Sequence, residues 1–297
     1  VGEGNVFYGC ASYNNADDGY DLYAKATAKY GPIGAVTIKN CVAYNNGILE
    51  DGTYSKASGN GFKLGGEGLT GKHKLIDSVS WNNGGSGIMS NNGPDCQVYN
   101  CIAVDNGVFS RNGGNADRNN YQLSPKNGTK YNGTTGYVLK NSISFYTDKI
   151  KETGTMACDK FVLLGQDESV IYNKTNYLCN DISTKISANS SNTQVAADWF
   201  ETVDYTNVSP VRKEDGSLDM KGLFVLTEKA KAIMAEQNKT EDNNDKPGDN
   251  EDVNKKTYDM GDATVITKEM LEEIKGKDIE VTFDMGDYSW TINGKDI

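Results

Sequence analysis

Short segments in which apolar and polar residues alternate recur along the first half of the chain, as in Val36-Thr-Ile-Lys-Asn-Cys41. Each segment leads into a six-residue pattern that occurs four times: Cys10-Ala-Ser-Tyr-Asn-Asn15, Cys41-Val-Ala-Tyr-Asn-Asn46, Ser78-Val-Ser-Trp-Asn-Asn83 and Cys101-Ile-Ala-Val-Asp-Asn106. A weaker fifth copy begins at Ser142. Alternation with a period of two is typical of β-strands, because successive side chains of a strand point to opposite faces. The pattern therefore predicts repeated strands.

The spacing of these copies is irregular. They start at positions 10, 41, 78, 101 and 142, so neighbouring starts differ by as few as 23 residues (101 minus 78) and as many as 41 (142 minus 101). A solenoid tolerates such variation, because each coil packs only against its neighbours and loops of any length can leave one side. We therefore expect an all-β solenoid.

Equivalent residues of successive coils should stack in columns. We expect an inward column of small side chains made by Cys10, Cys41, Ser78 and Cys101. We expect a turn ladder beside it made by Asn14, Asn45, Asn82 and Asp105, although paired Asn residues also simply favour turns. The six cysteines are sparse for a disulfide framework, and no pair has the Cys-x-x-Cys spacing of zinc or redox sites. Buried thiols are therefore expected rather than disulfides.

A second aligned strand follows each Asn pair: Gly19-Tyr-Asp-Leu22, Gly61-Phe-Lys-Leu64, Gly87-Ile-Met-Ser90 and Asn120-Tyr-Gln-Leu123. If the apolar second residue of each copy faces the core, Asp21 and Lys63 face outward on neighbouring coils. Adjacent strands lie about 4.8 Å apart, so the carboxylate and the ammonium would share one patch. An isolated surface ion pair of this kind contributes little.

Two features favour a functional site over such a pair. Asp17 and Asp18 place two further carboxylates beside Asp21, and crowded oxygen ligands without nearby His or Cys select a hard cation such as calcium. Lys63 lies in the glycine-rich string Gly59-Asn-Gly-Phe-Lys-Leu-Gly-Gly66, which would let a bulky polymer approach. Acidic turns are common, and glycine also serves tight turning alone.

These strings resemble the pectate lyases of polysaccharide lyase family 9. The resemblance covers roughly Val1 to Leu226 and includes Gly4-Asn-Val-Phe, Asp17-Asp18-Gly-Tyr-Asp21-Leu, Gly31-Pro-Ile-Gly-Ala-Val-Thr-Ile, Gly59 to Gly66 and Asp215-Gly-Ser-Leu. It implies a right-handed parallel β-helix, calcium ligands at Asp17, Asp18 and Asp21, and Lys63 as the base of a β-elimination on polygalacturonate. A further aspartate ligand of the family would lie before Val1.

Composition limits the partners. The net charge of −11 argues against nucleic acid or an anionic membrane surface, since either requires a basic face. No apolar run approaches the roughly 20 residues that span a bilayer. The chain begins at Val1 without a signal-peptide pattern and is expected to be a piece of a secreted, extracellular and bacterial precursor, acting as a monomer. Candidate contacts with the polyanionic substrate are Lys25, Lys72, Lys74 and Arg111.

Other functions compete with this hypothesis. A hydrolase on the same architecture would use paired acids and a Gly-His-Gly string. The single histidine lies instead in Lys72-His-Lys74, and we expect His73 to be solvated. A lyase acting on another uronate polymer such as rhamnogalacturonan, and a noncatalytic carbohydrate-binding solenoid, stay open as alternatives.

The C-terminal part has a different composition. We expect the β-helix domain to cover residues 1–237 and to end in a short helix over 227–237 that closes the end of the solenoid. Residues 238–256 are acidic and nearly without apolar residues, which indicates a flexible linker. Residues 257–297 predict a small, incomplete α+β accessory module with a capped helix at Thr267–Ile274 and two strands, at 279–283 and 288–292.

Overall fold

The computed structural model describes residues 2–25, 27, 33–107, 119–123, 138–148, 160–161, 175–178, 193–244, 255–259, 266–284 and 289–297. The chain forms two compact units, Val1–Asn243 and Asn244–Ile297. Within the described ranges, no helix is both long and apolar enough to cross a membrane.

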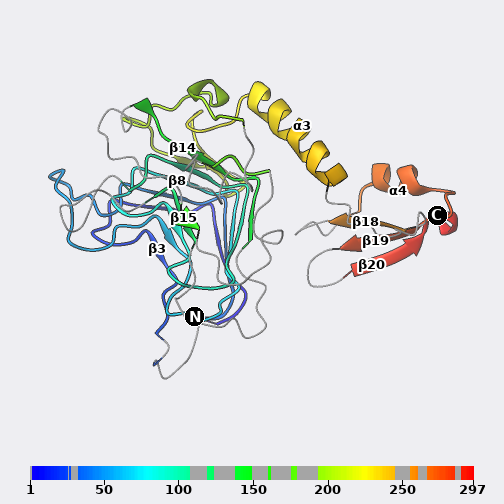
Figure 1. Cartoon of the computed structure of the whole chain (residues 1–297), viewed down its shortest axis with the longest axis horizontal. Helices are drawn as coiled ribbons and strands as arrows, with labels where there is room; N and C mark the ends of the chain where they lie inside the picture. The colour runs from blue at the N-terminus through cyan, green and yellow to red at the C-terminus, as the bar shows by residue number, and fades with distance from the viewer. Residues whose placement is uncertain are drawn as a thin grey trace. The chain divides into compact units, whose positions relative to one another are not determined.

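The first unit contains three parallel sheets of five strands each (Figure 1). Sheet A consists of β1 (Asn5–Tyr8), β4 (Val36–Lys39), β7 (Lys74–Ile76), β10 (Gln97–Tyr99) and β13 (Val138–Lys140). Sheet B consists of β2 (Ala11–Tyr13), β5 (Val42–Tyr44), β8 (Val79–Trp81), β11 (Ile102–Val104) and β14 (Ile143–Phe145). Sheet C consists of β3 (Tyr20–Asp21), β6 (Phe62–Lys63), β9 (Ile88–Met89), β12 (Tyr121–Leu123) and β15 (Lys160–Phe161).

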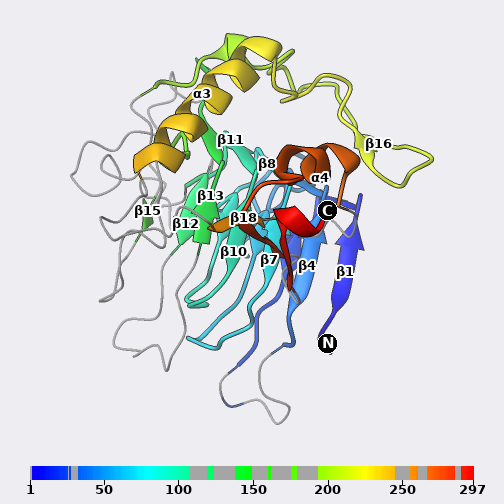
Figure 2. The same ribbon diagram turned by 90° about the vertical axis from the view of Figure 1, so that its right-hand side faces the viewer.

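Consecutive strands of the chain enter sheets A, B and C in turn. Strands of sheet A therefore pair with the strand one full coil away, as β1 does with β4, and all these pairs are parallel. Figure 2 shows β1, β4, β7, β10 and β13 side by side. The expected parallel β-helix is confirmed, and the irregular repeat spacing is accommodated in the connections between short strands.

Three residues of the expected column of small side chains lie inside the helix, whereas Cys10, in the first coil, is half-buried. Cys41, Ser78 and Cys101 are fully buried, and the backbone amide of Cys41 donates a hydrogen bond to Ser78 Oγ at 3.1 Å. Cys10, Cys41, Cys96 and Cys101 are free thiols. Burial raises the pKa of the Cys101 thiol to about 12, so this group packs as a neutral side chain. Cys158 and Cys179 lie outside the described residues.

The asparagine ladder runs mainly through the second residue of each pair. The ladder expected at the first residue has one amide rung, in which Asn82 Nδ2 donates to Asn45 Oδ1 at 2.8 Å. Amide Nδ2–Oδ1 hydrogen bonds of 2.8, 2.8, 2.7 and 2.9 Å link, in order, Asn15, Asn46, Asn83, Asn106 and Asn120. The first residues also adopt the left-handed conformation that Asn and Asp tolerate best, with φ of 55°, 54°, 50° and 50° at Asn14, Asn45, Asn82 and Asp105. The first residue sets the turn, and the second satisfies buried amides between coils.

The C-terminal part of this unit lies along the outer face of sheet B, where Figure 1 shows it over β8 and β14. It contains the 3-10 helix η2 (Ala197–Trp199), the antiparallel pair β16 (Val211–Arg212) and β17 (Leu218–Asp219), and α3 (Glu228–Asn244). Its Phe224 packs edge-on against Trp81, with ring centroids 5.8 Å apart. The prediction that this segment closes the end of the solenoid is wrong, because the outward aromatic residues of sheet B draw it to the side.

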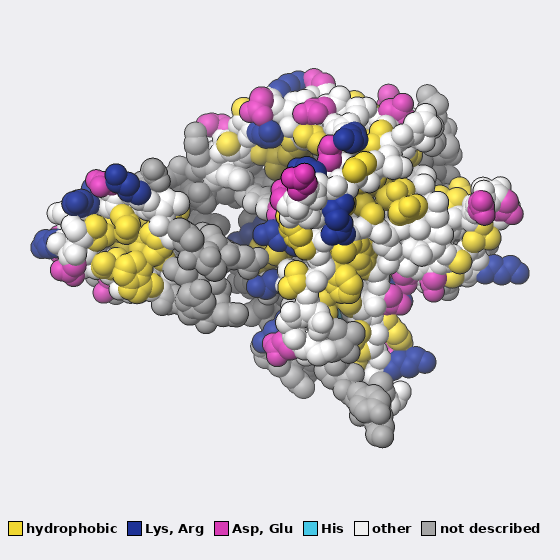
Figure 3. All heavy atoms as spheres, turned by 180° about the vertical axis from the view of Figure 1, so that it is seen from behind, with side chains coloured by type: hydrophobic (Ala, Val, Ile, Leu, Met, Phe, Trp, Pro, Cys, Tyr) yellow, Lys and Arg dark blue, Asp and Glu magenta, His cyan; other side chains and the backbone are white. Residues whose placement is uncertain are grey.

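The second unit pairs β18 (Lys255–Asp259) parallel to β19 (Glu280–Asp284), which pairs antiparallel with β20 (Ser289–Asn293). Helix α4 (Lys268–Ile274) begins after Thr267, whose side chain accepts a hydrogen bond from the amide of Met270, as expected for its cap. The 3-10 helix η3 (Gly294–Asp296) follows β20. Figure 3 shows hydrophobic side chains gathered on the face of this unit that is turned to the viewer.

The expected linker overlaps regular structure at both ends. Helix α3 continues to Asn244 instead of ending near residue 237, and β18 begins at Lys255. Residues 238–244 are all polar or charged, as in a solvated linker, so composition alone did not separate helix from linker.

Candidate active site

Strands β3 and β6 bring the predicted aspartate and lysine side by side. Their register pairs Tyr20 with Phe62 and Asp21 with Lys63. The Tyr20 and Phe62 rings stack with centroids 4.9 Å apart, and Phe62 is fully buried in the core. Because side chains alternate along a strand, Asp21 and Lys63 project from the outer face of sheet C.

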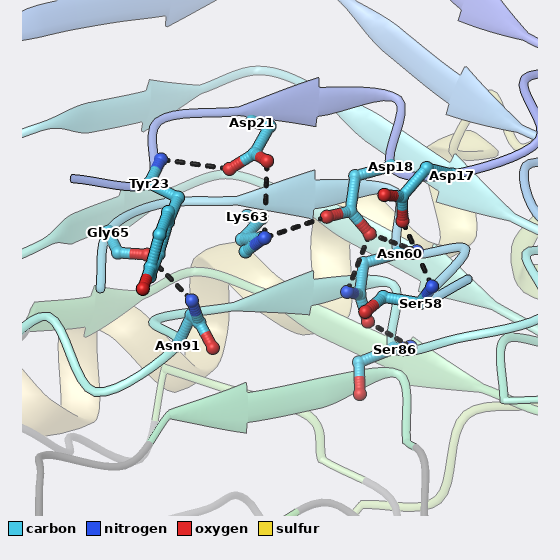
Figure 4. Close-up of polar contacts among 10 residues, drawn as sticks. All are labelled: Asp17, Asp18, Asp21, Tyr23, Ser58, Asn60, Lys63, Gly65, Ser86 and Asn91. Atoms are coloured by element: carbon cyan, nitrogen blue, oxygen red, sulfur yellow. Dashed lines mark hydrogen bonds and ion pairs between the residues drawn. The ribbon is translucent and has the colours of Figure 1, made fainter. Parts of the chain in front are cut away.

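The Lys63 ammonium is held between two carboxylates (Figure 4). Its Nζ lies 3.0 Å from Asp18 Oδ2 and 3.2 Å from Asp21 Oδ2. The side chains of Lys63, Asp18 and Asp21 are 14%, 2% and 44% exposed, so the pair with Asp18 is largely shielded from water and the pair with Asp21 is open. Burial acts to lower the pKa of Lys63, but the hydrogen bond and charge of Asp18, reinforced by Asp21, raise it overall.

Neighbouring backbone and amide groups fix the aspartates. Asp18 Oδ1 accepts hydrogen bonds from the Asn60 backbone at 2.8 Å and from its side-chain amide at 2.7 Å. Asp17 Oδ1 accepts one from the Ser58 amide at 2.9 Å. Ser58 and Asn60 belong to the segment that leads into β6, so the coil that carries Lys63 also orients the carboxylates of the coil before it (Figure 4).

The chemistry of the three carboxylates favours a metal ion, whereas their arrangement in this structure does not. Three carboxylates suit calcium in chemistry, since calcium prefers oxygen ligands. Among the residues that the structure describes, however, no group of three His, Cys, Asp or Glu side chains is arranged to hold a metal ion. Asp18 and Asp21 instead share the Lys63 ammonium. A cation that bound these two carboxylates would therefore have to compete with Lys63.

Besides Ser58 and Asn60, Tyr23 and Glu67 belong to this site without having been predicted from the sequence. The ring of Tyr23 lies against Lys63, with Nζ 4.9 Å from the ring centroid, and the Tyr23 hydroxyl donates to Glu67 Oε1 at 2.5 Å. Tyr23 follows Asp21 by two positions, so strand alternation could have indicated that it faces the same side. No pattern in the sequence pointed to Glu67, which comes from a loop.

The glycine-rich frame of Lys63 serves contacts within the protein. A Cβ on Gly59 would lie 2.7 Å from Gly47 Cα, and Gly59 has a φ of +64°. A Cβ on Gly66 would lie 2.2 Å from the ring of Tyr23. These positions need glycine for close packing, which favours the plainer of the two interpretations of the string.

Two of the expected substrate lysines, Lys72 and Lys74, lie at sheet A and not beside Lys63. Lys74 belongs to β7 of sheet A, and Lys72 is exposed just before that strand, whereas Lys63 is on sheet C. Lys25 is exposed downstream of β3, and Arg111 lies outside the described residues.

The prediction that His73 is solvated is wrong. His73 is 3% exposed, and its Nδ1 accepts a hydrogen bond from the Val36 amide at 3.2 Å. Burial lowers its pKa, and the nearby Asp95 carboxylate offsets this only in part. The imidazole is therefore a satisfied interior group that joins two coils.

Comparison with known proteins agrees with this fold and site region. The family model described as "Pel9A-like, right handed beta helix region" matches residues 1–120, which include Asp17, Asp18, Asp21 and Lys63. The resemblance to the family 9 pectate lyases is confirmed by this match and by the relatives that follow.

Two curated relatives are named pectate lyase L. The protein of Thermoclostridium stercorarium is 39% identical over 172 residues, 57% of this chain and 13% of that protein. The protein of Paenibacillus polymyxa (strain SC2) is 46% identical over 109 residues, 36% of this chain and 24% of that protein. The chain therefore spans less than a quarter of these relatives.

Two solved structures share the fold. The crystal structure of pectate lyase Pel9A superposes with a TM-score of 0.51 at 25% identity, covering 76% of this chain and 45% of that one. A rhamnogalacturonan lyase superposes with a TM-score of 0.54 at 20% identity, covering 79% of this chain and 51% of that one. At that lower identity the likeness concerns the fold alone.

Proposed function

We propose that this chain is part of a pectate lyase that cleaves polygalacturonate by β-elimination, with Lys63 as the base. One observation carries the proposal: an amine with two carboxylates at 3.0 and 3.2 Å projects from the outer face of a β-helix, inside the Pel9A-like residues. The names of the curated relatives support the same reaction. The proposal also holds that the protein is extracellular, bacterial and monomeric.

The reaction assigns one proton transfer to Lys63. The neutral amine takes the proton from carbon 5 of a uronate, the C–H electron pair forms the double bond between carbons 4 and 5, and the bond from carbon 4 to the linking oxygen breaks. Solvent protonates the leaving oxygen. Because Asp18 and Asp21 raise the pKa of Lys63, most of the amine is charged at neutral pH, and turnover should rise as the pH becomes alkaline.

The proposal includes a calcium ion bound by Asp17, Asp18 and Asp21 as its ligands. When bound, it would neutralise the substrate carboxylate and stabilise the developing enolate charge. The contribution of the chain itself is the orientation of these carboxylates by Ser58 and Asn60, at 2.9 and 2.8 Å. Binding of Asp18 and Asp21 to a cation would also remove the contacts that raise the pKa of Lys63.

Calorimetry tests the metal assignment separately from turnover. Asp18→Ala and Asp21→Ala should each weaken calcium binding at least about tenfold, which is about 1.4 kcal/mol. Lys63→Ala should strengthen it, because a competing cation is removed. Asp51→Ala is the matched control, since the Asp51 carboxylate accepts hydrogen bonds from Thr53 on an exposed loop. Unchanged calcium affinity in both site variants would remove calcium from the proposal.

The activity itself is tested by incubating the chain with polygalacturonate and calcium while recording ultraviolet absorbance. Elimination creates a 4,5-unsaturated uronate that absorbs, whereas hydrolysis releases reducing ends without it. We expect absorbance that grows with alkaline pH and disappears with chelator. Reducing ends without absorbance would indicate a hydrolase instead, and polymer binding without cleavage would indicate a noncatalytic solenoid.

A further inference from the structure

A tyrosine ring forms the third neighbour of the Lys63 amine. The Tyr23 ring centroid lies 4.9 Å from Lys63 Nζ, and Figure 4 shows this ring on the side of Lys63 away from Asp18. An ammonium over an aromatic face is attracted by the ring quadrupole. The position of Nζ is therefore fixed by two carboxylates and by one ring, which come from the turn before β3, from β3 and from the residues just after it.

Three contacts fix the ring in turn. The Tyr23 amide donates to Asp21 Oδ1 at 2.8 Å, and the Tyr23 hydroxyl donates to Glu67 Oε1 at 2.5 Å. The edge of the ring fills the space that Gly66 leaves by lacking a Cβ, since an added Cβ would lie 2.2 Å from Tyr23 Cδ2. Glu67 has a φ of +51°, a conformation that residues other than glycine adopt rarely. The residue that accepts the hydrogen bond from the Tyr23 hydroxyl, Glu67, thus has an unusual backbone conformation.

We propose that Tyr23 is a positioning residue that places the Lys63 amine for proton abstraction, with Glu67 and Gly66 holding the ring. The inference rests on the proposed lyase function for its kinetic consequence. Asp18 and Asp21 have a second proposed task as calcium ligands, so their contacts with Lys63 change when a cation binds. The Tyr23 ring is not a proposed calcium ligand, so it confines the Lys63 amine with or without a bound cation.

Kinetics on polygalacturonate test this role. Tyr23→Leu should lower kcat about 10- to 100-fold with KM within about twofold, since misplacing a reacting group by about 1 Å has effects of this size. Tyr23→Phe keeps the ring and loses only the bond to Glu67, so it should retain most of the turnover. Gly66→Ala should reproduce the Tyr23→Leu defect by displacing the ring. Tyr54→Leu is the matched control, because Tyr54 is 42% exposed on a loop.

A kcat of Tyr23→Leu equal to wild type, or a change confined to KM, would overturn the positioning role. Equal loss in Tyr23→Phe and Tyr23→Leu would also contradict it, because the ring would then not be the active element. Thermal unfolding of each variant confirms that it is folded before its kinetics are compared.

A second measurement does not depend on turnover. In protein labelled with carbon-13 at lysine Cε, the Lys63 signal should be displaced by the Tyr23 ring current, and the missing signal of Lys63→Arg identifies it. The displacement should persist in Tyr23→Phe and vanish in Tyr23→Leu and Gly66→Ala. An undisplaced Lys63 signal in the wild-type protein would overturn the inference even if the enzyme is active. A displaced signal in a protein without lyase activity would contradict the proposed function and leave the ring contact standing.

Discussion

The outer faces of sheets B and C are built from the same coils and differ in what covers them. On sheet B the outward positions carry Tyr44 and Trp81, stacked with centroids 4.2 Å apart, and the C-terminal part of the unit buries them. On sheet C the equivalent outward positions carry Asp21 and Lys63, and Asp21 stays 44% exposed. In a β-helix the interior is fixed by stacking, so the outward columns distinguish a stabilising face from a candidate functional one.

The largest expected effect concerns the face of sheet C. Lys63→Arg keeps the positive charge between Asp18 and Asp21 and should keep the fold, yet a guanidinium does not release its proton in this pH range. Turnover of polygalacturonate should fall by about 10³-fold in Lys63→Arg and in Lys63→Ala, within the range of general-base catalysis. Steady-state kinetics with each variant measure this loss. Full activity in either would remove Lys63 as the base.

A substitution on the outer face of sheet B should change the stability of the protein instead of its turnover. Trp81→Ala removes a side chain that is 1% exposed, and we expect the free energy of unfolding in urea to fall by about 3–5 kcal/mol. Turnover per folded molecule should be unchanged. Trp290→Ala is the matched control, since Trp290 is 46% exposed in the second unit. If Trp81→Ala instead lowered turnover and left stability intact, the two faces would not divide as described.

A smaller stability effect should come from the asparagine ladder between the faces. Asn83 is fully buried, and its amide donates to Ala43 O, Ser80 Oγ and Asn106 Oδ1. Asn83→Ala should cost about 2–3 kcal/mol, because buried partners lose their hydrogen bonds. Asn15→Ala, at the exposed end of the same ladder, should cost less than about 1 kcal/mol. Equal costs at both positions would show that burial does not set the strength of the ladder.

The smallest effect is the pH response of His73. Burial lowers its pKa, so the folded state disfavours the charged imidazole. Its contribution to stability is therefore present above the unfolded pKa of about 6.5 and is lost as the pH falls through the lower folded value. The chain has a single histidine, so proton NMR can follow its titration without ambiguity. A pKa at or above the ordinary value would mean that His73 is solvated after all.

The repeat determined much of what could be predicted. The copies at Cys10, Cys41, Ser78 and Cys101 placed the strands of sheet B, and the strings at Gly19 and Gly61 placed Asp21 opposite Lys63. Both results follow from the period of two and from in-register stacking, which are local properties of the sequence.

What escaped prediction depends on contacts between distant parts of the chain. The pairing of Tyr23 with Glu67 joins residues 44 positions apart, and a loop rather than a strand brings them together. His73 is buried beside the preceding coil, where the Val36 amide donates a hydrogen bond to its Nδ1. The side-on position of the C-terminal segment depends on the outward aromatic residues of sheet B that it covers. Tertiary packing decided each of these, and no local pattern records it.

The proton transfer assigned to Lys63 can be tested most directly by chemical rescue. Lys63→Ala should be almost inactive on polygalacturonate with calcium, and added small primary amines should restore elimination in proportion to their neutral concentration, which absorbance of the unsaturated product would follow. The space left by the side chain, beside Asp18 and Asp21, would admit such an amine. We expect rescue by amines and none by guanidinium. Elimination by Lys63→Ala at the wild-type rate, without any added amine, would contradict it.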